Sequence, residues 1–228
     1  MENTIHITEW LDNFQECLLA LFGERLKFFG LQGSYGRGEQ TAASDIDVVV
    51  IVDKLDFADL NAYRTLLDSM EHSELICGFV AGEEELLNWE KSDLLQLYMD
   101  THPIMGTLEG LQTLFSADDV RKAVLMGACN LYHASSHNFL HARNRSVLVE
   151  LYKTARFTVR MKHYMEHGEY ISSMTVLAKK VSDEDRSVLE KAQAVSVTDD
   201  EAKFEANSRM LIEWSSKLIR NIGITENH

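Results

Sequence analysis

The chain has 228 residues, which is enough for two modest domains that each bury a core. Its 22 Lys and Arg residues stand against 36 Asp and Glu residues, and the resulting formal charge of -14 disfavours non-specific binding to nucleic acid or anionic lipid. The three cysteines are widely separated and odd in number, so they predict neither a disulfide framework nor a zinc knuckle.

The first half of the chain alternates helical and strand patterns. Apolar residues at helical spacing predict a helix over residues 8–22, and a short apolar run predicts a strand over 26–31. Gly33-Ser34 marks a turn, after which β-branched residues predict a strand over 45–52. The later elements are a helix over 57–70, a strand over 75–80, a helix starting over 83–89, and a segment of either type over 94–99.

The second half of the chain is helical throughout by pattern. Ser116, followed by acids at 118 and 119, predicts a helix start. We therefore expect an α+β protein, with an N-terminal α/β domain over 1–113 that holds a mixed sheet and an all-helical C-terminal domain over 114–228. The predicted helices of the second domain cover 118–142, 145–167, 183–195 and 199–221.

Two acids stand at the start of a strand that otherwise looks buried. Strand side chains alternate between faces, so Asp45 and Asp47 share one side while Ile46 takes the other. Two like charges this close repel each other unless a cation lies between them, and a hard divalent ion such as Mg²⁺ prefers oxygen ligands. The pair therefore predicts a metal site.

The turn before this strand has the character of a phosphate site. Gly33 permits backbone N–H groups to approach a phosphate, and Ser34 adds a hydroxyl donor. A phosphate cradle close in sequence to a metal site is the combination that nucleoside triphosphate chemistry requires, because the metal neutralises the triphosphate during attack at one phosphorus.

The string over residues 33–47 resembles the signature of the nucleotidyltransferase superfamily related to DNA polymerase β, in which a Gly-Ser turn precedes Asp-x-Asp on the next strand. It is similar to the branch that adenylylates aminoglycosides such as streptomycin and spectinomycin. The segments 151–156, 166–171 and 185–192 resemble the helical domain of that branch. The positions that carry the string are Gly33, Ser34, Arg37, Gly38, Ser44, Asp45 and Asp47.

This resemblance implies an enzyme that uses Mg²⁺ as cofactor and ATP as nucleotide donor. It implies that Asp45 and Asp47 are catalytic and hold the metal. It also implies a C-terminal helical domain that binds the acceptor, with nucleotide and acceptor meeting between the two domains. The expected nucleotide contacts in the string are Gly33, Ser34, Arg37 and Ser44.

A group of basic residues in the second half offers a further phosphate contact. We expect Lys153 first among them to contact the triphosphate, with exposed helix faces as the alternative. The family tends to carry a lysine shortly after a helix-breaking glycine, whereas this chain has Ser172-Ser173 there. The basic group comprises Arg143, Arg145, Lys153, Arg156, Arg160 and Lys162.

Transfer to a hydroxyl also needs a general base, and the resemblance implies a third acid on the strand beside Asp45 and Asp47. Glu74 is the only acid on that strand and stands at its start, while Cys77 occupies the middle, where we would expect the acid. We therefore expect Glu74 to be the third catalytic acid. Asp100 is the alternative, and Glu83 to Glu85 fit the negative first turn of a helix better.

Three histidines recur at every fourth position, at His133, His137 and His141. On a helix they form one stripe, and an i,i+4 histidine pair can bind zinc. No neighbouring Glu or Cys completes a ligand set, so a stripe that faces solvent or lines a cleft is the favoured interpretation.

We expect transfer of AMP, or of another nucleoside monophosphate, to a hydroxyl of a small acceptor, with release of pyrophosphate. The acidic charge of the chain suits a cationic acceptor. An aminoglycoside acceptor would connect the enzyme with antibiotic resistance. The alternatives are a nucleotidyltransferase of toxin–antitoxin type that modifies a protein or RNA, and an inert nucleotide-binding regulator. No long apolar run or basic leader is present, so we expect a cytoplasmic protein without a membrane partner.

Overall fold

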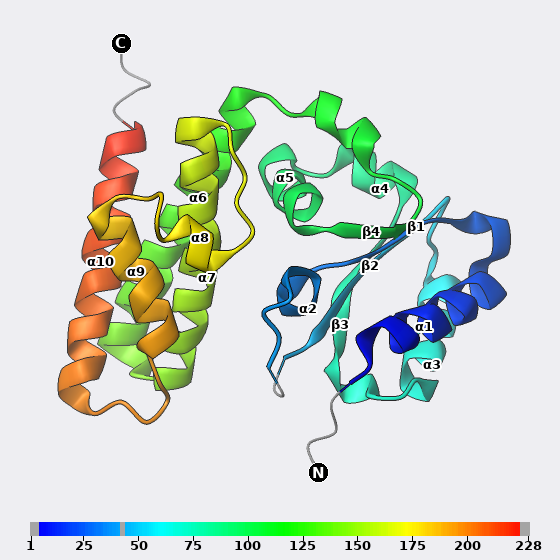
Figure 1. Ribbon diagram of the computed structural model, residues 1–228, viewed down its shortest axis with the longest axis horizontal. Helices are drawn as coiled ribbons and strands as arrows, with labels where there is room; N and C mark the ends of the chain where they lie inside the picture. The colour runs from blue at the N-terminus through cyan, green and yellow to red at the C-terminus, as the bar shows by residue number, and fades with distance from the viewer. Residues whose placement is uncertain (1–4, 42–43, 224–228) are drawn as a thin grey trace. The chain divides into compact units, whose positions relative to one another are not determined.

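The computed structural model describes residues 5–41 and 44–223, and the chain divides into two compact units between Phe115 and Ser116 (Figure 1). The N-terminal unit contains a sheet with helices on both faces, and the C-terminal unit is helical. This architecture confirms the predicted α+β class.

The sheet of the N-terminal unit is mixed, as predicted. Its strand order is β3-β2-β1-β4, with β1 antiparallel to both β2 and β4, and β2 parallel to β3. The fourth strand has only four residues, mostly exposed, and its pattern gave no sequence signal. The strands are β1 (Leu26–Leu31), β2 (Ile46–Val52), β3 (Ile76–Gly82) and β4 (His102–Met105).

The side chains of β2 alternate between the two faces of the sheet and belong to two separate cores. One face of the sheet packs against α1 (Ile7–Phe22) and α3 (Phe57–Ser69), and Ile46 and Val48 of β2 belong to that core. Val49 and Ile51 of β2 belong to a second core on the opposite face, together with residues of the segments around α5. The pattern over 94–99 allowed either a helix or a strand, and the structure forms a helix there. The segments on that face are α4 (Glu83–Asn88), α5 (Lys91–Asp100) and the 3₁₀ segment η3 (Glu109–Leu114).

The turn expected at Gly33-Ser34 is a short helix, α2 (Gly33–Arg37). It is closed by backbone hydrogen bonds from Gly36 N to Gln32 O (3.0 Å) and from Glu39 N to Ser34 O (2.8 Å). Strand β2 begins one residue later than predicted, so Asp45 immediately precedes the strand and Asp47 lies within it. Two further 3₁₀ turns lead into β1 and β3, namely η1 (Gly23–Arg25) and η2 (Ser73–Leu75).

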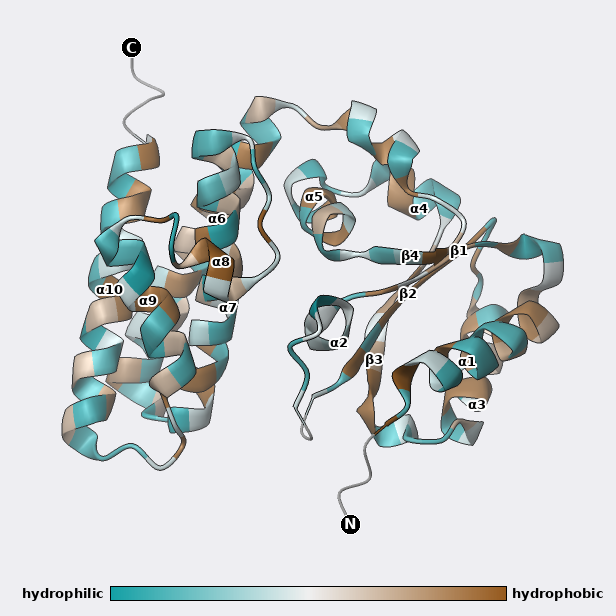
Figure 2. Cartoon of the chain, in the orientation of Figure 1, coloured by the Kyte–Doolittle hydropathy of each residue, from teal (hydrophilic) through white to brown (hydrophobic). Residues whose placement is uncertain are grey.

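The C-terminal unit confirms the four predicted long helices. The first of them, α6 (Ala117–His137), packs against both α7 (Arg145–His167) and α10 (Glu201–Gly223). Apolar residues line the interior that these helices share (Figure 2). Across the part of the chain that the structure describes, no helix combines the length and hydrophobicity that a membrane span needs. The elements are α6 (Ala117–His137), the π-helical η4 (Asn138–Ala142), α7 (Arg145–His167), α8 (Met174–Leu177), α9 (Asp183–Ala194) and α10 (Glu201–Gly223).

Candidate active site

The site is organised by a close contact between α2 and β2. Gly33 has φ of +66°, and a Cβ built on it would lie 1.8 Å from Oδ2 of Asp47. Next to it, the backbone N–H of Gln32 donates to the carbonyl of Asp47 over 2.7 Å. The Asp47 carboxylate therefore lies directly against the Gly33 backbone, at a distance that only a residue without a side chain permits.

Asp45 and Asp47 occupy different environments. Asp45 is exposed, whereas Asp47 is half-buried on the face of β2 opposite Ile46 and Val48. Burial raises the pKa of Asp47, and the negative charge of Asp45 raises it further. A cation that shares both carboxylates would relieve this repulsion.

Arg37, at the end of α2, is the nearby cation. Its Nη1 donates to Oδ2 of Asp100 over 2.7 Å and its Nε donates to Oε2 of Glu39 over 3.2 Å. Its charge also opposes the rise in the pKa of Asp47, while the Asp100 charge adds to that rise. The structure therefore brings Asp45, Asp47, Arg37 and Asp100 into one electrostatic neighbourhood.

The two serines of the sequence string lie at either end of it. Ser34 is half-buried in α2, next to Gly33. Ser44 accepts a hydrogen bond at Oγ from the backbone N–H of Thr41 (2.9 Å), and its own N–H donates to Thr41 O (3.0 Å), so Thr41 and Ser44 are linked by two hydrogen bonds directly before Asp45. Nucleotide contacts by both serines stay predictions.

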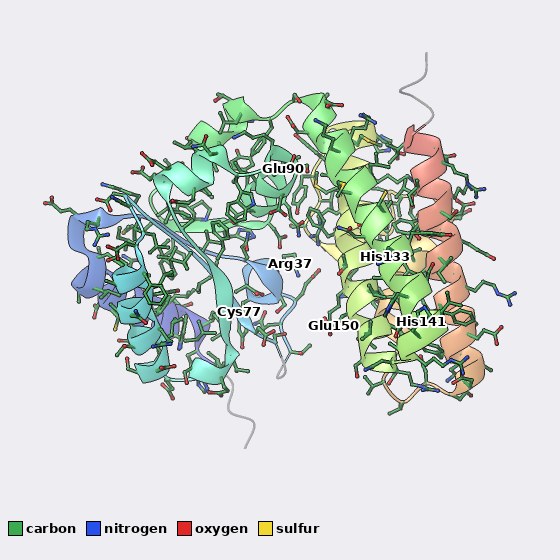
Figure 3. The ribbon with its side chains drawn as sticks, turned by 180° about the vertical axis from the view of Figure 1, so that it is seen from behind. Arg37, Cys77, Glu90, His133, His141 and Glu150 are labelled. Carbon is green, nitrogen blue, oxygen red and sulfur yellow. The ribbon has the colours of Figure 1, made fainter. Side chains whose placement is uncertain are left out.

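The strand expected to carry the third acid is β3. Cys77 pairs directly with Asp47 in the parallel register, so the two residues share a face, and Cys77 is exposed. The expectation that Glu74 lies on this strand is wrong, because β3 begins at Ile76 and Glu74 is exposed in the preceding 3₁₀ turn η2; its role as general base stays a prediction. Asp100, at the end of α5, lies outside the Asp-x-Asp pair, and its negative charge raises the pKa of Asp47. Figure 3 labels Cys77 and Arg37.

Local sequence did not reveal how Asp100 is placed. The side chain of Gln32 donates from Nε2 to Thr101 Oγ1 (2.7 Å) and to Leu97 O (3.1 Å), which ties the end of β1 to the end of α5. These contacts join residues more than sixty positions apart, and glutamine and threonine carry no motif that points to them. Sequence reasoning named Asp100 only as an alternative and missed Gln32.

The basic residues of the C-terminal unit are mostly engaged within that unit. Arg145 donates to Asp199 O and pairs with Glu201, and Lys162 pairs with Asp185. Arg156 donates to Ala192 O (2.5 Å), and Arg160 donates to Ile171 O (3.0 Å) and Ser172 O (2.9 Å).

Lys153, the expected phosphate contact, is different from these structural cations. Its side chain is 58% exposed on α7 and forms a surface ion pair with Glu150 at 2.7 Å, of the kind that contributes little to stability. Lys153 is therefore available to other partners. Its contact with nucleotide stays a prediction.

The histidine stripe forms as predicted on α6 and η4, with ring centroids 6.4 Å apart for His133 and His137 and 5.0 Å apart for His137 and His141 (Figure 3). Over residues 5–41 and 44–223, no three His, Cys, Asp or Glu side chains are arranged to hold a metal ion by themselves.

The Asp45–Asp47 pair fits a hard divalent cation. Its donors are carboxylate oxygens, which Mg²⁺ prefers, and Mg²⁺ sites commonly combine one or two carboxylates with substrate phosphates and water. The space above Gly33 that a Cβ would fill is taken by one of those carboxylates. The two carboxylates thus supply oxygen donors of the kind that a hard divalent ion prefers.

Comparison with known proteins identifies the family of the N-terminal half of the chain. The family described as "Nucleotidyltransferase domain" matches residues 11–124, half of the chain and all of the segment from α2 to β4. The chain therefore belongs to the nucleotidyltransferase family, and the predicted membership and enzyme class are confirmed.

Individual relatives are distant. A spectinomycin adenyltransferase from Enterococcus faecialis, solved with ATP and spectinomycin, shares the fold, with a TM-score of 0.57 and 15% identity over 93% of this chain and 99% of that one. A candidate protein adenylyltransferase of Methanocaldococcus jannaschii is 40% identical over 47 residues, which are 21% of this chain and 47% of the relative, so the match spans about half of that protein. A toxin–antitoxin complex with AMP-PNP has a TM-score of only 0.33 and carries no weight here.

The close approach at Gly33 can be tested against a matched glycine. Gly38 has φ of +67°, almost the same as Gly33, but a Cβ there would meet nothing within 4 Å. Each change to Ala carries a similar backbone cost, about 1–3 kcal/mol for a strained φ. Only Gly33→Ala also displaces the Asp47 carboxylate, so we expect its dissociation constant for MgATP to rise about tenfold or more, measured by calorimetry. Equal affinities of the two variants would contradict the role of this contact.

A second prediction follows from the environment of Asp47. Because burial raises its pKa, the folded state holds the proton more tightly than the unfolded chain does, and the ionised carboxylate destabilises the fold above its folded pKa. Asp47→Asn should therefore raise the melting temperature of the metal-free protein at pH 7. The difference should shrink as the pH falls through the folded pKa.

The control for this experiment is Asp68→Asn, which changes an exposed acid on α3 and should leave the melting temperature unaltered. A metal-free Asp47→Asn variant that melts below the wild type would show that the ionised carboxylate stabilises the fold.

Proposed function

We propose that this protein transfers AMP from MgATP to a hydroxyl of a small-molecule acceptor and releases pyrophosphate. The observation that carries the proposal is the contact of the Asp47 carboxylate with the Gly33 backbone, next to Asp45 and Arg37. This contact combines a glycine turn suited to phosphate with a carboxylate pair suited to a divalent ion.

Each residue of the site has a proposed task. Asp45 and Asp47 hold the Mg²⁺, which neutralises triphosphate charge when bound. The Gly33 backbone, the Ser34 hydroxyl and the Arg37 guanidinium bind phosphate oxygens, because N–H and O–H donors match their lone pairs. Ser44, which directly precedes Asp45, and Lys153 of the C-terminal unit are proposed as further phosphate contacts.

The general base of the transfer is proposed to be Glu74. It is exposed, so an acceptor hydroxyl has access to it, and it stands two residues before Ile76, which pairs with Ile46 of β2. A base must lie within hydrogen-bond reach of the proton that it takes, directly or through one water molecule. Cys77, which pairs with Asp47, carries a thiol at the position where the resemblance implies a carboxylate.

The C-terminal helical unit, residues 116–228, is proposed to bind the acceptor. The acidic chain, with its formal charge of -14, favours a cationic acceptor such as an aminoglycoside. Shared fold with an adenyltransferase that was solved with spectinomycin supports this class. Such an activity would act in the cytoplasm, where MgATP is present, and would lower sensitivity to the antibiotic.

A protein acceptor is the second candidate. It is favoured by the local similarity of 47 residues to the candidate protein adenylyltransferase of Methanocaldococcus jannaschii. Labelled ATP distinguishes the two, because label would appear on a protein band in one case and on a small molecule in the other.

We expect MgATP to raise the melting temperature, since a ligand that binds only the folded state stabilises it, by about 2.7 kcal/mol at one hundred times its dissociation constant. ATP with EDTA should do much less.

Pyrophosphate release should then appear with one acceptor in a panel of aminoglycosides. Asp45→Asn should lose both nucleotide binding and turnover, whereas Glu74→Gln should lower turnover by about a hundredfold with little change in binding.

Two results would contradict the proposal. Absence of any thermal shift with millimolar MgATP, MgGTP and MgCTP would remove the nucleotide site. Binding of MgATP without release of pyrophosphate from ATP in the presence of any acceptor, small molecule or protein, would instead point to an inert regulator in which Cys77 stands where an acid is needed.

A further inference from the structure

Arg37 is held by two carboxylates from different parts of the N-terminal unit. Asp100 accepts from Nη1 at 2.7 Å and Glu39 accepts from Nε at 3.2 Å. The Arg37 side chain is only 19% exposed and that of Asp100 only 16%. Charge-assisted hydrogen bonds in such a shielded place fix a guanidinium more firmly than pairs on an open surface do.

Asp100 itself is fixed to the same frame as Asp47. The chain of contacts runs from Asp47 O to Gln32 N (2.7 Å), from Gln32 Nε2 to Thr101 Oγ1 (2.7 Å), and then to Asp100, the residue before Thr101. Asp100 contacts Arg37, and Arg37 ends the short helix that starts at Gly33. The contacts form a closed loop around the turn, so the guanidinium has a set position relative to Asp47.

A cation fixed there has a clear use. The turn is surrounded by the charges of Asp45, Asp47, Asp100 and Glu39, with Arg37 as the cation that acts on Asp47. A triphosphate that enters this field is repelled unless fixed positive charge accompanies the metal. A guanidinium binds phosphate through two parallel N–H groups, which requires the correct orientation of its plane.

We propose that Asp100 is a positioning residue that holds the Arg37 guanidinium in the orientation in which it binds the triphosphate. The inference rests on the proposed function, because it requires a nucleotide at this turn. Asp100 does not touch the nucleotide. It acts through Arg37, and the closed loop of contacts through Gln32 and Thr101 keeps it in place.

The test is a double-mutant cycle on nucleotide binding, which needs no known acceptor. Asp100→Ala should raise the dissociation constant for MgATP about tenfold, measured by calorimetry, and Asp100→Asn should raise it less because an amide oxygen still accepts from Nη1. In an Arg37→Ala background, Asp100→Ala should have no further effect. Affinity for adenosine should stay the same in every variant, since adenosine has no phosphate for Arg37 to bind.

The chain offers a closely matched control. Arg25 and Asp59 form another ion pair of the same unit, with the same 2.7 Å separation and an Asp side chain that is also 16% exposed. Asp59→Ala should lower the melting temperature, because Asp59 also accepts from the backbone N–H of Asp56 in the capping box of α3, yet leave the dissociation constant for MgATP unchanged. This comparison separates a general loss of stability from a loss of positioning.

Four results would overturn the inference. If Asp100→Ala bound MgATP as tightly as the wild type, Arg37 would not depend on Asp100. If it bound MgATP more tightly, the ion pair with Asp100 would be keeping Arg37 away from the nucleotide. A tenfold loss that persists in the Arg37→Ala background would show that Asp100 acts by another route. Failure of the wild type itself to bind MgATP would overturn the proposed function as well, whereas the first three results leave that function standing.

Discussion

The contact of the Asp47 carboxylate with Gly33 is the constraint on which the rest of the site depends. Because the carboxylate occupies the place of a Cβ, the residue at position 33 must be glycine, and β2 must lie close beside the end of β1. The close approach of Gly33 to Asp47 places α2, which carries Ser34 and Arg37, directly beside the start of β2, which carries Asp47. The contact between the Gly33 backbone and the Asp47 carboxylate therefore links the predicted phosphate site to the predicted metal site.

That closeness has an electrostatic cost, which the surroundings of the turn limit. Asp47 is half-buried and lies in the field of Asp45 and Asp100, so its pKa is raised by burial first and by these charges next. Arg37 opposes this effect, and a divalent ion would oppose it further. Such a site is disfavoured when empty and favours a ligand that brings positive charge, which is the behaviour that an enzyme using a metal–nucleotide complex needs.

The sequence predicted those parts of the protein that local patterns encode. The β-branched run over 46–52 and the helical spacing of α1, α3, α6, α7, α9 and α10 identified their elements, because periodicity reports directly on which face is buried. Strand β4 has four mostly exposed residues and left no such pattern. The Gly-Ser string located the site, but the bond of Arg37 to Asp100 joins positions 63 apart and depends on tertiary packing.

Crystals grown with Mn²⁺ and a non-hydrolysable ATP analogue would test the central claim most directly, because anomalous scattering locates the metal without reference to any activity. We expect a Mn²⁺ ion bound to one carboxylate oxygen from each of Asp45 and Asp47 and to phosphate oxygens of the analogue, with the phosphates at the Gly33-Ser34 turn. A nucleotide bound elsewhere on the chain, or a metal bound without either aspartate, would contradict it.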